Sequence, residues 1–196
     1  MIYLPKTFER YLSALRLYVQ MSVLKDSGVK QLSQLKLINL AEAFYYKKEK
    51  TPTDIIKLSN SLLGAAVIML MQRGIRLFTS FSGDGVQLIS KRLYTAFLSE
   101  LIYLSHDGSE IKVSTEYGNV IIKATGVGTS DILLRLIIAL EGFFLFERVS
   151  DKWLIAIPTE PTELKADAVE NEWCYILDRF SPINIWLLNT KKDNNS

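Results

Sequence analysis

The residues that could carry chemistry in this chain are few, and their spacing assembles no reaction centre. The single histidine, His106, and the single cysteine, Cys174, lie far apart in sequence, so neither a metal site nor a cysteine–histidine nucleophile pair is predicted. No serine stands in a G-x-S-x-G turn, and no glycine-rich loop ends in the lysine of a P-loop. The sequence therefore predicts no catalytic residue, no bound metal and no cofactor.

The composition is that of a globular protein with a substantial core. Of the 196 residues, 48% are hydrophobic and 22% are charged, a balance that excludes a largely disordered chain. The 23 basic and 21 acidic side chains leave a formal net charge of +2, so no footprint for nucleic acid or for a membrane surface is expected. A lone cysteine and the absence of a bilayer-length apolar run predict a cytoplasmic protein without a membrane anchor.

Residues 1–50 predict a helical hairpin. Apolar residues recur at three- and four-residue spacing from Thr7 to a glycine stop at 26–28, and a second stripe runs from Leu32 to the lysines at 47–50. Two helices joined by so short a turn lie antiparallel and carry apolar surface on more than one side. The hairpin is therefore expected to pack on the following domain, on a second copy of itself, or on both.

Residues 51–190 predict an α+β domain, and residues 191–196 predict a disordered tail. The expected elements are a loop with Thr53 as helix N-cap, a helix Ile55–Gln72, a strand Ile75–Phe81, an extended piece Val86–Ile89, a helix capped by Ser90, strands Ile111–Thr115 and Val120–Thr125, a helix Asp131–Glu141, strands Phe143–Val149 and Trp153–Ile157, a helix Glu163–Leu177 and a strand Ile183–Leu188. This order is typical of a sandwich in which a mixed sheet carries its helices on one face.

Several segments give the chain a resemblance to sensor histidine kinases. Residues 93–113 (LYTAFLSELIYLSHDGSEIKV), followed by the return strand and the glycines at 126–128, resemble the middle of that family's ATP-binding domain. Residues 133–142 (LLRLIIALEG) and 153–158 (WLIAIP) resemble its closing helix and final hairpin, and residues 34–44 (QLKLINLAEAF) resemble the second helix of its dimerisation hairpin. The resemblance covers residues 5–158. It implies a four-helix bundle on dimerisation and a histidine-kinase ATPase-like domain.

The positions that the resemblance assigns to the nucleotide have lost the family's residues. The asparagine that holds magnesium falls at Glu100, whose carboxylate would face the nucleotide's negative charge and offers no amide donor. The aspartate that binds adenine falls at Ala124, which has no acceptor. Gly126 and Gly128 match the family's glycines, although a strand-to-helix turn needs such residues anyway. Between Gly128 and the helix at Asp131 there is no room for a lid over ATP.

The phosphoacceptor is missing too, because no histidine precedes His106 and the hairpin therefore carries none. The favoured hypothesis is a pseudokinase of two-component signalling: a homodimer through the hairpin that binds a response regulator or a kinase, with Tyr11, Tyr18 and Met21 as the candidate partner surface. An enzyme that binds a nucleotide through Glu100 and magnesium is one alternative. A phosphotransfer protein is another, disfavoured by the absent hairpin histidine.

Overall fold

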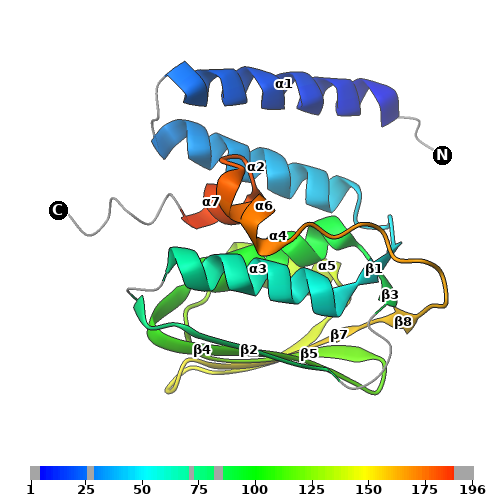
Figure 1. Ribbon diagram of the computed structural model, residues 1–196, viewed down its shortest axis with the longest axis vertical. Helices are drawn as coiled ribbons and strands as arrows, with labels where there is room; N and C mark the ends of the chain where they lie inside the picture. Colours follow the sequence, from blue (N-terminus) through cyan, green and yellow to red (C-terminus); the bar gives the residue numbers. More distant parts are fainter. Residues whose placement is uncertain (1–4, 26–28, 71–72, 82–85, 188–196) are drawn as a thin grey trace.

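A five-stranded sheet forms the base of the molecule in the computed structural model, and the helices lie on one side of it (Figure 1). The structure describes residues 5–25, 29–70, 73–81 and 86–187. In spatial order the strands are β2 (Arg76–Phe81), β4 (Ser105–Glu116), β5 (Asn119–Val127), β7 (Lys152–Pro158) and β6 (Phe143–Glu147). β2 and β4 are parallel, and the other neighbours are antiparallel. The predicted α+β class, with a mixed sheet and its helices on one face, is confirmed.

Three helices cover the inner face of this sheet. They are α3 (Ile55–Met69), α4 (Lys91–Tyr103) and α5 (Asp131–Ala139). Their enclosed side chains form one core with the inward-pointing residues of the strands, of which Ile122 and Ile155 are fully buried. Each such aliphatic side chain stabilises the fold by about 1.5–3 kcal/mol relative to exposure. Because strand side chains alternate between faces, the outer face of the sheet stays in solvent.

The N-terminal hairpin lies on the far side of these helices from the sheet (Figure 1). It consists of α1 (Pro5–Lys25) and α2 (Val29–Tyr45), and α2 lies between α1 and the rest of the molecule. α2 buries Leu35 and Ile38 in the common core. The expectation that the hairpin packs on the following domain is therefore met by α2, and the predicted dimer remains a prediction.

A second, smaller sheet replaces the loop predicted at 51–54. It contains β1 (Thr51–Asp54), β3 (Val86–Ile89) and β8 (Glu160–Pro161), all antiparallel, in the order β1-β3-β8. Thr53 was the wrong N-cap, because its side chain is buried in β1. Asp54 caps α3 instead, and its carboxylate accepts a hydrogen bond of 2.9 Å from the amide of Lys57. A carboxylate there also interacts favourably with the helix dipole.

The helix predicted over Glu163–Leu177 is wrong for most of its length. Only α6 (Glu172–Leu177) is helical, and the residues between β8 and α6 run as irregular chain. α6 begins where Asn171 caps it, since the Asn171 side chain accepts a hydrogen bond of 3.1 Å from the amide of Cys174. The cap, rather than the charged residues before it, decides where this helix starts.

The strand predicted over Ile183–Leu188 is also wrong. Its residues form α7 (Pro182–Leu187), and Leu188 lies outside the described residues. Proline suits the first helical position, and the Ser181 hydroxyl accepts a hydrogen bond of 3.2 Å from the amide of Asn184. A short apolar run is ambiguous between a buried strand and a buried helix, and local capping decides this one.

Some predictions fall where nothing can be compared. The glycine stop at 26–28, the helix end at Gln72 and the tail at 191–196 lie outside the described residues. Among the residues that are described, no helix combines the length and apolar character needed to cross a membrane.

Candidate functional site

Glu100, the position that the resemblance assigns to a magnesium-holding asparagine, lies in the layer between the sheet and the hairpin. Its side chain is only 2% exposed. α4 is buried almost throughout, because the sheet covers one side of it and both α2 and α7 pack against it. A carboxylate enclosed in this way is very unfavourable unless it is paired and hydrogen-bonded.

Both carboxylate oxygens of Glu100 have partners, each from a different helix or its cap. Lys36 of α2 places its Nζ 2.6 Å from Oε2, and the indole Nε1 of Trp186 in α7 donates to the same oxygen at 2.8 Å. The hydroxyl of Ser130 donates to Oε1 at 2.9 Å. We call Lys36, Glu100, Ser130 and Trp186 the Glu100 cluster. It joins the hairpin, the helical layer and the C-terminal helix at one point.

Aromatic rings enclose the Lys36 ammonium. Nζ lies 4.1 Å from the centroid of the Tyr103 ring and 5.3 Å from that of Trp186, and the side chain is 13% exposed. Ring faces attract a cation most strongly when it is desolvated. The buried charges of Lys36 and Glu100 are therefore compensated by each other, by two neutral donors and by the rings.

Ser130 ties the cluster to the start of α5. It is the N-cap of that helix, and its hydroxyl accepts a hydrogen bond of 3.0 Å from the amide of Leu133 while donating to Glu100. Just before it, the amide of Gly128 donates to the carbonyl of Leu104 at 3.0 Å. The chain thus passes directly from β5 to α5, as the short spacing predicted.

Ala124, the position assigned to an adenine-binding aspartate, is part of the apolar core. It is 2% exposed on β5, and it pairs across the sheet with Ile111 and Trp153. No polar side-chain atom is available at this position. Glu100 and Ala124 are therefore both enclosed, one within a charged cluster and the other among apolar side chains.

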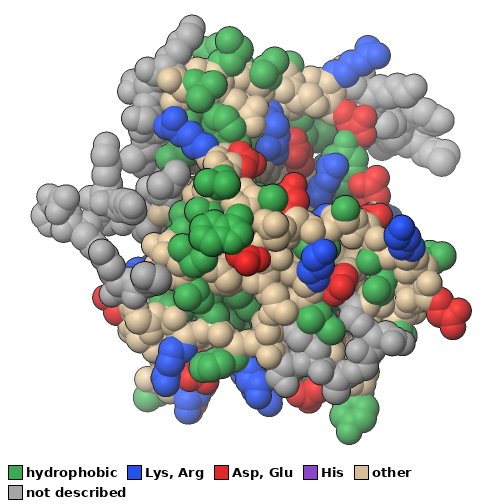
Figure 2. Space-filling view, in the orientation of Figure 1, with side chains coloured by type: hydrophobic (Ala, Val, Ile, Leu, Met, Phe, Trp, Pro, Cys, Tyr) green, Lys and Arg blue, Asp and Glu red, His purple; other side chains and the backbone are tan. Residues whose placement is uncertain are grey.

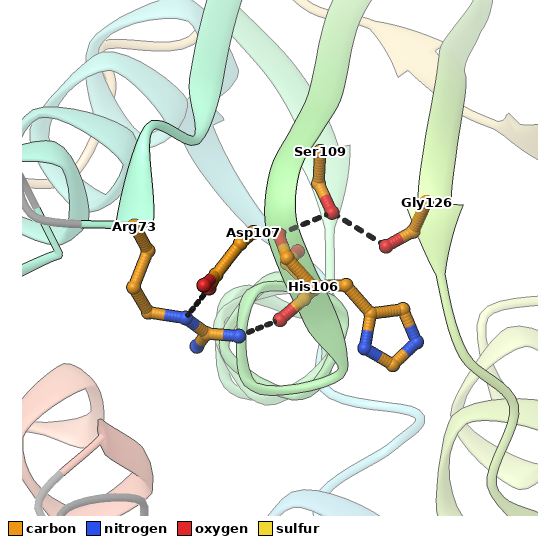
Figure 3. Close-up of polar contacts among 6 residues, drawn as sticks. Arg73, His106, Asp107, Ser109 and Gly126 are labelled. Atoms are coloured by element: carbon orange, nitrogen blue, oxygen red, sulfur yellow. Dashed lines mark hydrogen bonds and ion pairs between the residues drawn. The ribbon is translucent and has the colours of Figure 1, made fainter.

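Gly126 and Gly128 have structural roles where β5 ends. Gly126 has φ +69°, and a Cβ there would lie 3.0 Å from Ser109 Oγ. The Ser109 hydroxyl is within hydrogen-bond distance of the carbonyls of His106 and Gly126, which links the start of β4 to the end of β5 (Figure 3). A Cβ at Gly128 would meet His106 Nε2 at 3.6 Å, an ordinary contact.

His106 lies in β4, which begins at Ser105 and contains an irregularity before Glu110. Its exposed side chain points away from Arg73 (Figure 3). Arg73 instead pairs through Nε with Asp107 at 3.0 Å and donates to the Ser105 carbonyl. Among the described residues, no group of three potential metal-ligating side chains is found.

The three residues predicted as a partner surface are all exposed. Tyr11, Tyr18 and Met21 are 64%, 70% and 52% exposed on α1. Leu17 and Leu24 extend the same apolar surface, with exposures of 60% and 65%. Figure 2 shows hydrophobic side chains gathered on the outer side of the hairpin. We call these five residues the α1 face.

A cleft of about 430 Å³ lies beside Trp186, between the hairpin, α4 and the C-terminal segment. Two of its charged groups pair with each other, Arg16 with Glu42 at 2.7 Å, and the Arg92 guanidinium lies 4.2 Å from the ring of Tyr46. Burial, with a smaller contribution from nearby Glu170, raises the pKa of Tyr175 to about 12. The cleft is thus lined by one ion pair, further charged side chains and a neutral phenol.

The sequence prediction missed three members of the Glu100 cluster. Trp186 lay in a segment predicted as a strand, and Ser130 was recognised only as part of a short connection. The available signal for Lys36 was a lysine between Leu35 and Leu37 in a helix expected to bury one face. Only the packing of the helices brings these side chains together.

The solved structures to which this chain is similar are histidine kinases of low sequence identity. No protein-family model matches the chain, and no curated protein does. Among solved structures, the histidine kinase AdeS of Acinetobacter baumannii matches with a TM-score of 0.48 at 16% identity, over 76% of this chain and 95% of that one. The catalytic domain of histidine kinase ThkA matches with 0.42 at 11%, over 58% and 99%. The blue-light activated histidine kinase EL346 of Erythrobacter litoralis matches with 0.40 at 13%, over 76% and 62%.

Proposed function

We propose that this protein is a catalytically inactive histidine-kinase-like protein of the cytoplasm, which acts in signal transduction as a dimeric binding module for a response regulator or a kinase. The observation that supports this most is that protein side chains already contact the carboxylate of Glu100. Both of its oxygens are engaged, by Lys36 and Trp186 on one side and by Ser130 on the other. A carboxylate in this state is a structural anchor rather than a free metal ligand.

Binding of magnesium at Glu100 would require the cluster to open. The ammonium of Lys36 lies 2.6 Å from Oε2, so a divalent cation would have to displace it against charge repulsion. The indole of Trp186 would also have to leave the same oxygen, and with it α7 would lose a fully buried side chain. The cost of these changes opposes the binding of a magnesium–nucleotide complex.

The base of a nucleotide would also lack its partner. Adenine recognition by hydrogen bonding needs an acceptor, and Ala124 presents a methyl group inside the core. A site without this contact loses both affinity and selectivity, because the exocyclic amine would be desolvated without compensation. Glu100 thus disfavours the magnesium and phosphate contacts of a nucleotide, and Ala124 independently disfavours the contact with its base.

Dimerisation through the hairpin is supported by the α1 face. Its five apolar side chains are each more than half exposed, although the opposite side of α1 buries Leu12, Val19 and Val23 against the molecule. An apolar stripe on a helix that already has one packed side is the arrangement that a four-helix bundle buries. We infer an isologous contact between two hairpins, in which each α1 face packs against the other copy.

The dimer can be tested by sedimentation velocity at micromolar concentration. We expect the wild-type protein to sediment as a dimer and Tyr18→Glu/Met21→Glu to sediment as a monomer, because two carboxylates would be desolvated in the contact. Leu164→Glu changes an exposed apolar residue outside the hairpin and is the matched control. A wild-type monomer, or a double variant that stays dimeric, would contradict this part of the proposal.

The binding role requires a direct partner assay. Purified receiver domains and histidine-kinase hairpins encoded in the same genome would be titrated against the protein by calorimetry. We expect at least one to bind in the micromolar range and to release no phosphate. If none binds, and the protein instead hydrolyses ATP or transfers its phosphate, the scaffold role is wrong.

A further inference from the structure

The outer face of the five-stranded sheet carries two positive charges that nothing in the described structure compensates. Lys112 of β4 and Lys123 of β5 are directly opposite each other in the ladder, and both are exposed. Like charges placed opposite each other on one sheet face are destabilising. No carboxylate of the described residues pairs with either lysine.

The other basic side chains of this face are paired, whereas Glu116, on the same side of β4, accepts a hydrogen bond of 3.2 Å from Ser114 and forms no ion pair among the described residues. Arg76 pairs with Glu110 at 3.3 Å, and Lys152 pairs with Glu147 at 3.9 Å. Among the described residues, the basic side chains of this face that have no ion pair are therefore Lys112 and Lys123. This arrangement is unexpected in a chain whose total formal charge is only +2.

Apolar side chains flank the lysine pair in the same row across the sheet. Phe78 is the register partner of Lys112, and Leu154 is that of Lys123, followed by Leu145 on β6. Phe78, Leu154 and Leu145 are 47%, 40% and 71% exposed. A depression of about 530 Å³ includes both lysines and both leucines. The row thus reads apolar, positive, positive, apolar, apolar.

We propose that this row binds an extended acidic segment of a partner protein, in which two carboxylates lie between apolar side chains. The carboxylates would pair with Lys112 and Lys123, and the apolar groups would cover Phe78 and Leu154. Neighbouring strands are about 4.8 Å apart, so the distance from Phe78 to Leu154 is about 14 Å. About four residues of extended chain cover that distance.

A peptide suits this face better than the other anionic partners. Nucleic acids are held by basic tracks that neutralise many phosphates, and membrane surfaces are bound by clusters of about four to eight basic residues. Here a single lysine pair stands between apolar groups, and none of the described helices covers it (Figure 1). The face is also separate from the α1 face, so its role is independent of dimerisation.

The probe for the test is a fluorescein-labelled peptide whose central pair of glutamates is flanked by phenylalanine and leucine. We expect fluorescence anisotropy to show saturable binding that weakens as salt is added, and amide shifts in nuclear magnetic resonance to map to β4, β5 and β7. A peptide with lysines in place of the glutamates should not bind. Absence of binding to the acidic peptide, or shifts that map elsewhere, would overturn the proposal.

Two variants separate binding from folding. Lys123→Glu should weaken the peptide by about tenfold or more, yet it should not lower the melting temperature, since the new carboxylate can pair with Lys112. Lys57→Glu/Lys165→Glu changes exposed lysines elsewhere and should bind the peptide normally. Equal binding by Lys123→Glu and wild type would overturn the proposal. Tighter binding to phosphatidylserine vesicles or to a single-stranded oligonucleotide than to the peptide would overturn it too.

Discussion

Replacing Lys36 by methionine removes one charge of the Glu100 cluster while keeping most of the side-chain volume. The carboxylate of Glu100, 2% exposed, would then keep only the neutral donors Trp186 and Ser130. Removing one partner of a buried ion pair costs about 3–5 kcal/mol. For a chain of this size, each kcal/mol lowers the melting temperature by about 2–4 °C, so a decrease of about 6–20 °C is expected.

The second substitution in this cycle is Glu100→Gln. In the double variant Lys36→Met/Glu100→Gln no buried charge remains, and the amide can still accept a hydrogen bond from Trp186 and interact with Ser130. We therefore expect the double variant to be more stable than Lys36→Met alone, with a coupling energy of about 2 kcal/mol or more.

Urea denaturation followed by circular dichroism, at one fixed protein concentration, measures these free energies. Lys57→Met on α3 is the matched control, since this exposed lysine forms no ion pair among the described residues, and it should change stability by less than about 0.5 kcal/mol. Lys36→Met could instead lower the free energy of unfolding by less than about 1 kcal/mol, or the effects of Lys36→Met and Glu100→Gln could be additive. Either result would show that the Glu100 cluster is not a structural anchor.

Three further predictions follow from buried polar groups. Ser130→Ala removes both the α5 cap and a donor to Glu100 and should cost about 1–3 kcal/mol, whereas Ser130→Thr should cost much less; thermal melts compare them. Trp186→Phe should lower the free energy of unfolding, measured by urea denaturation, by about 1–3 kcal/mol because it removes the indole donor. A decrease no larger than the smaller ring alone would cause would contradict a stabilising hydrogen bond to Glu100. Burial raises the pKa of Tyr94 above its ordinary value of 10.0. The neutral phenol therefore contributes its full stabilisation of the folded state below pH 10.0, and this contribution is lost as the pH rises further. Tyr94→Phe should therefore flatten the alkaline fall in stability by about 1.4 kcal/mol per pH unit, and an unchanged slope in urea titrations would contradict this.

Elements with strong periodicity could be predicted from the sequence. The hairpin helices, α4 and β5 lie close to where their apolar spacing placed them, and β4 contains its predicted residues but begins six residues earlier, at Ser105. The C-terminal part could not be predicted in the same way, because Ile183 to Leu187 is too short and too uniformly apolar to show a period. Its state depends on Ser181 and on the surface that it packs against.

The positions of the candidate site could be predicted, but their surroundings could not. Alignment with a family pattern located Glu100 and Ala124 on a helix and a strand. The partners of Glu100 come from three distant segments, and only tertiary packing brings Lys36 and Trp186 to the same oxygen. The sequence therefore showed which residues differ from the family pattern that it resembles, and the fold shows what these residues contact.

The central claim is that the chain binds no magnesium–nucleotide complex. Calorimetric titration of the purified protein with ATP and with ADP, each with and without magnesium, tests it most directly, and thermal shift gives an independent readout. We predict no heat of binding and no rise in melting temperature at millimolar nucleotide. Saturable magnesium-dependent binding that Glu100→Ala abolishes would contradict the claim and would favour a nucleotide-binding enzyme.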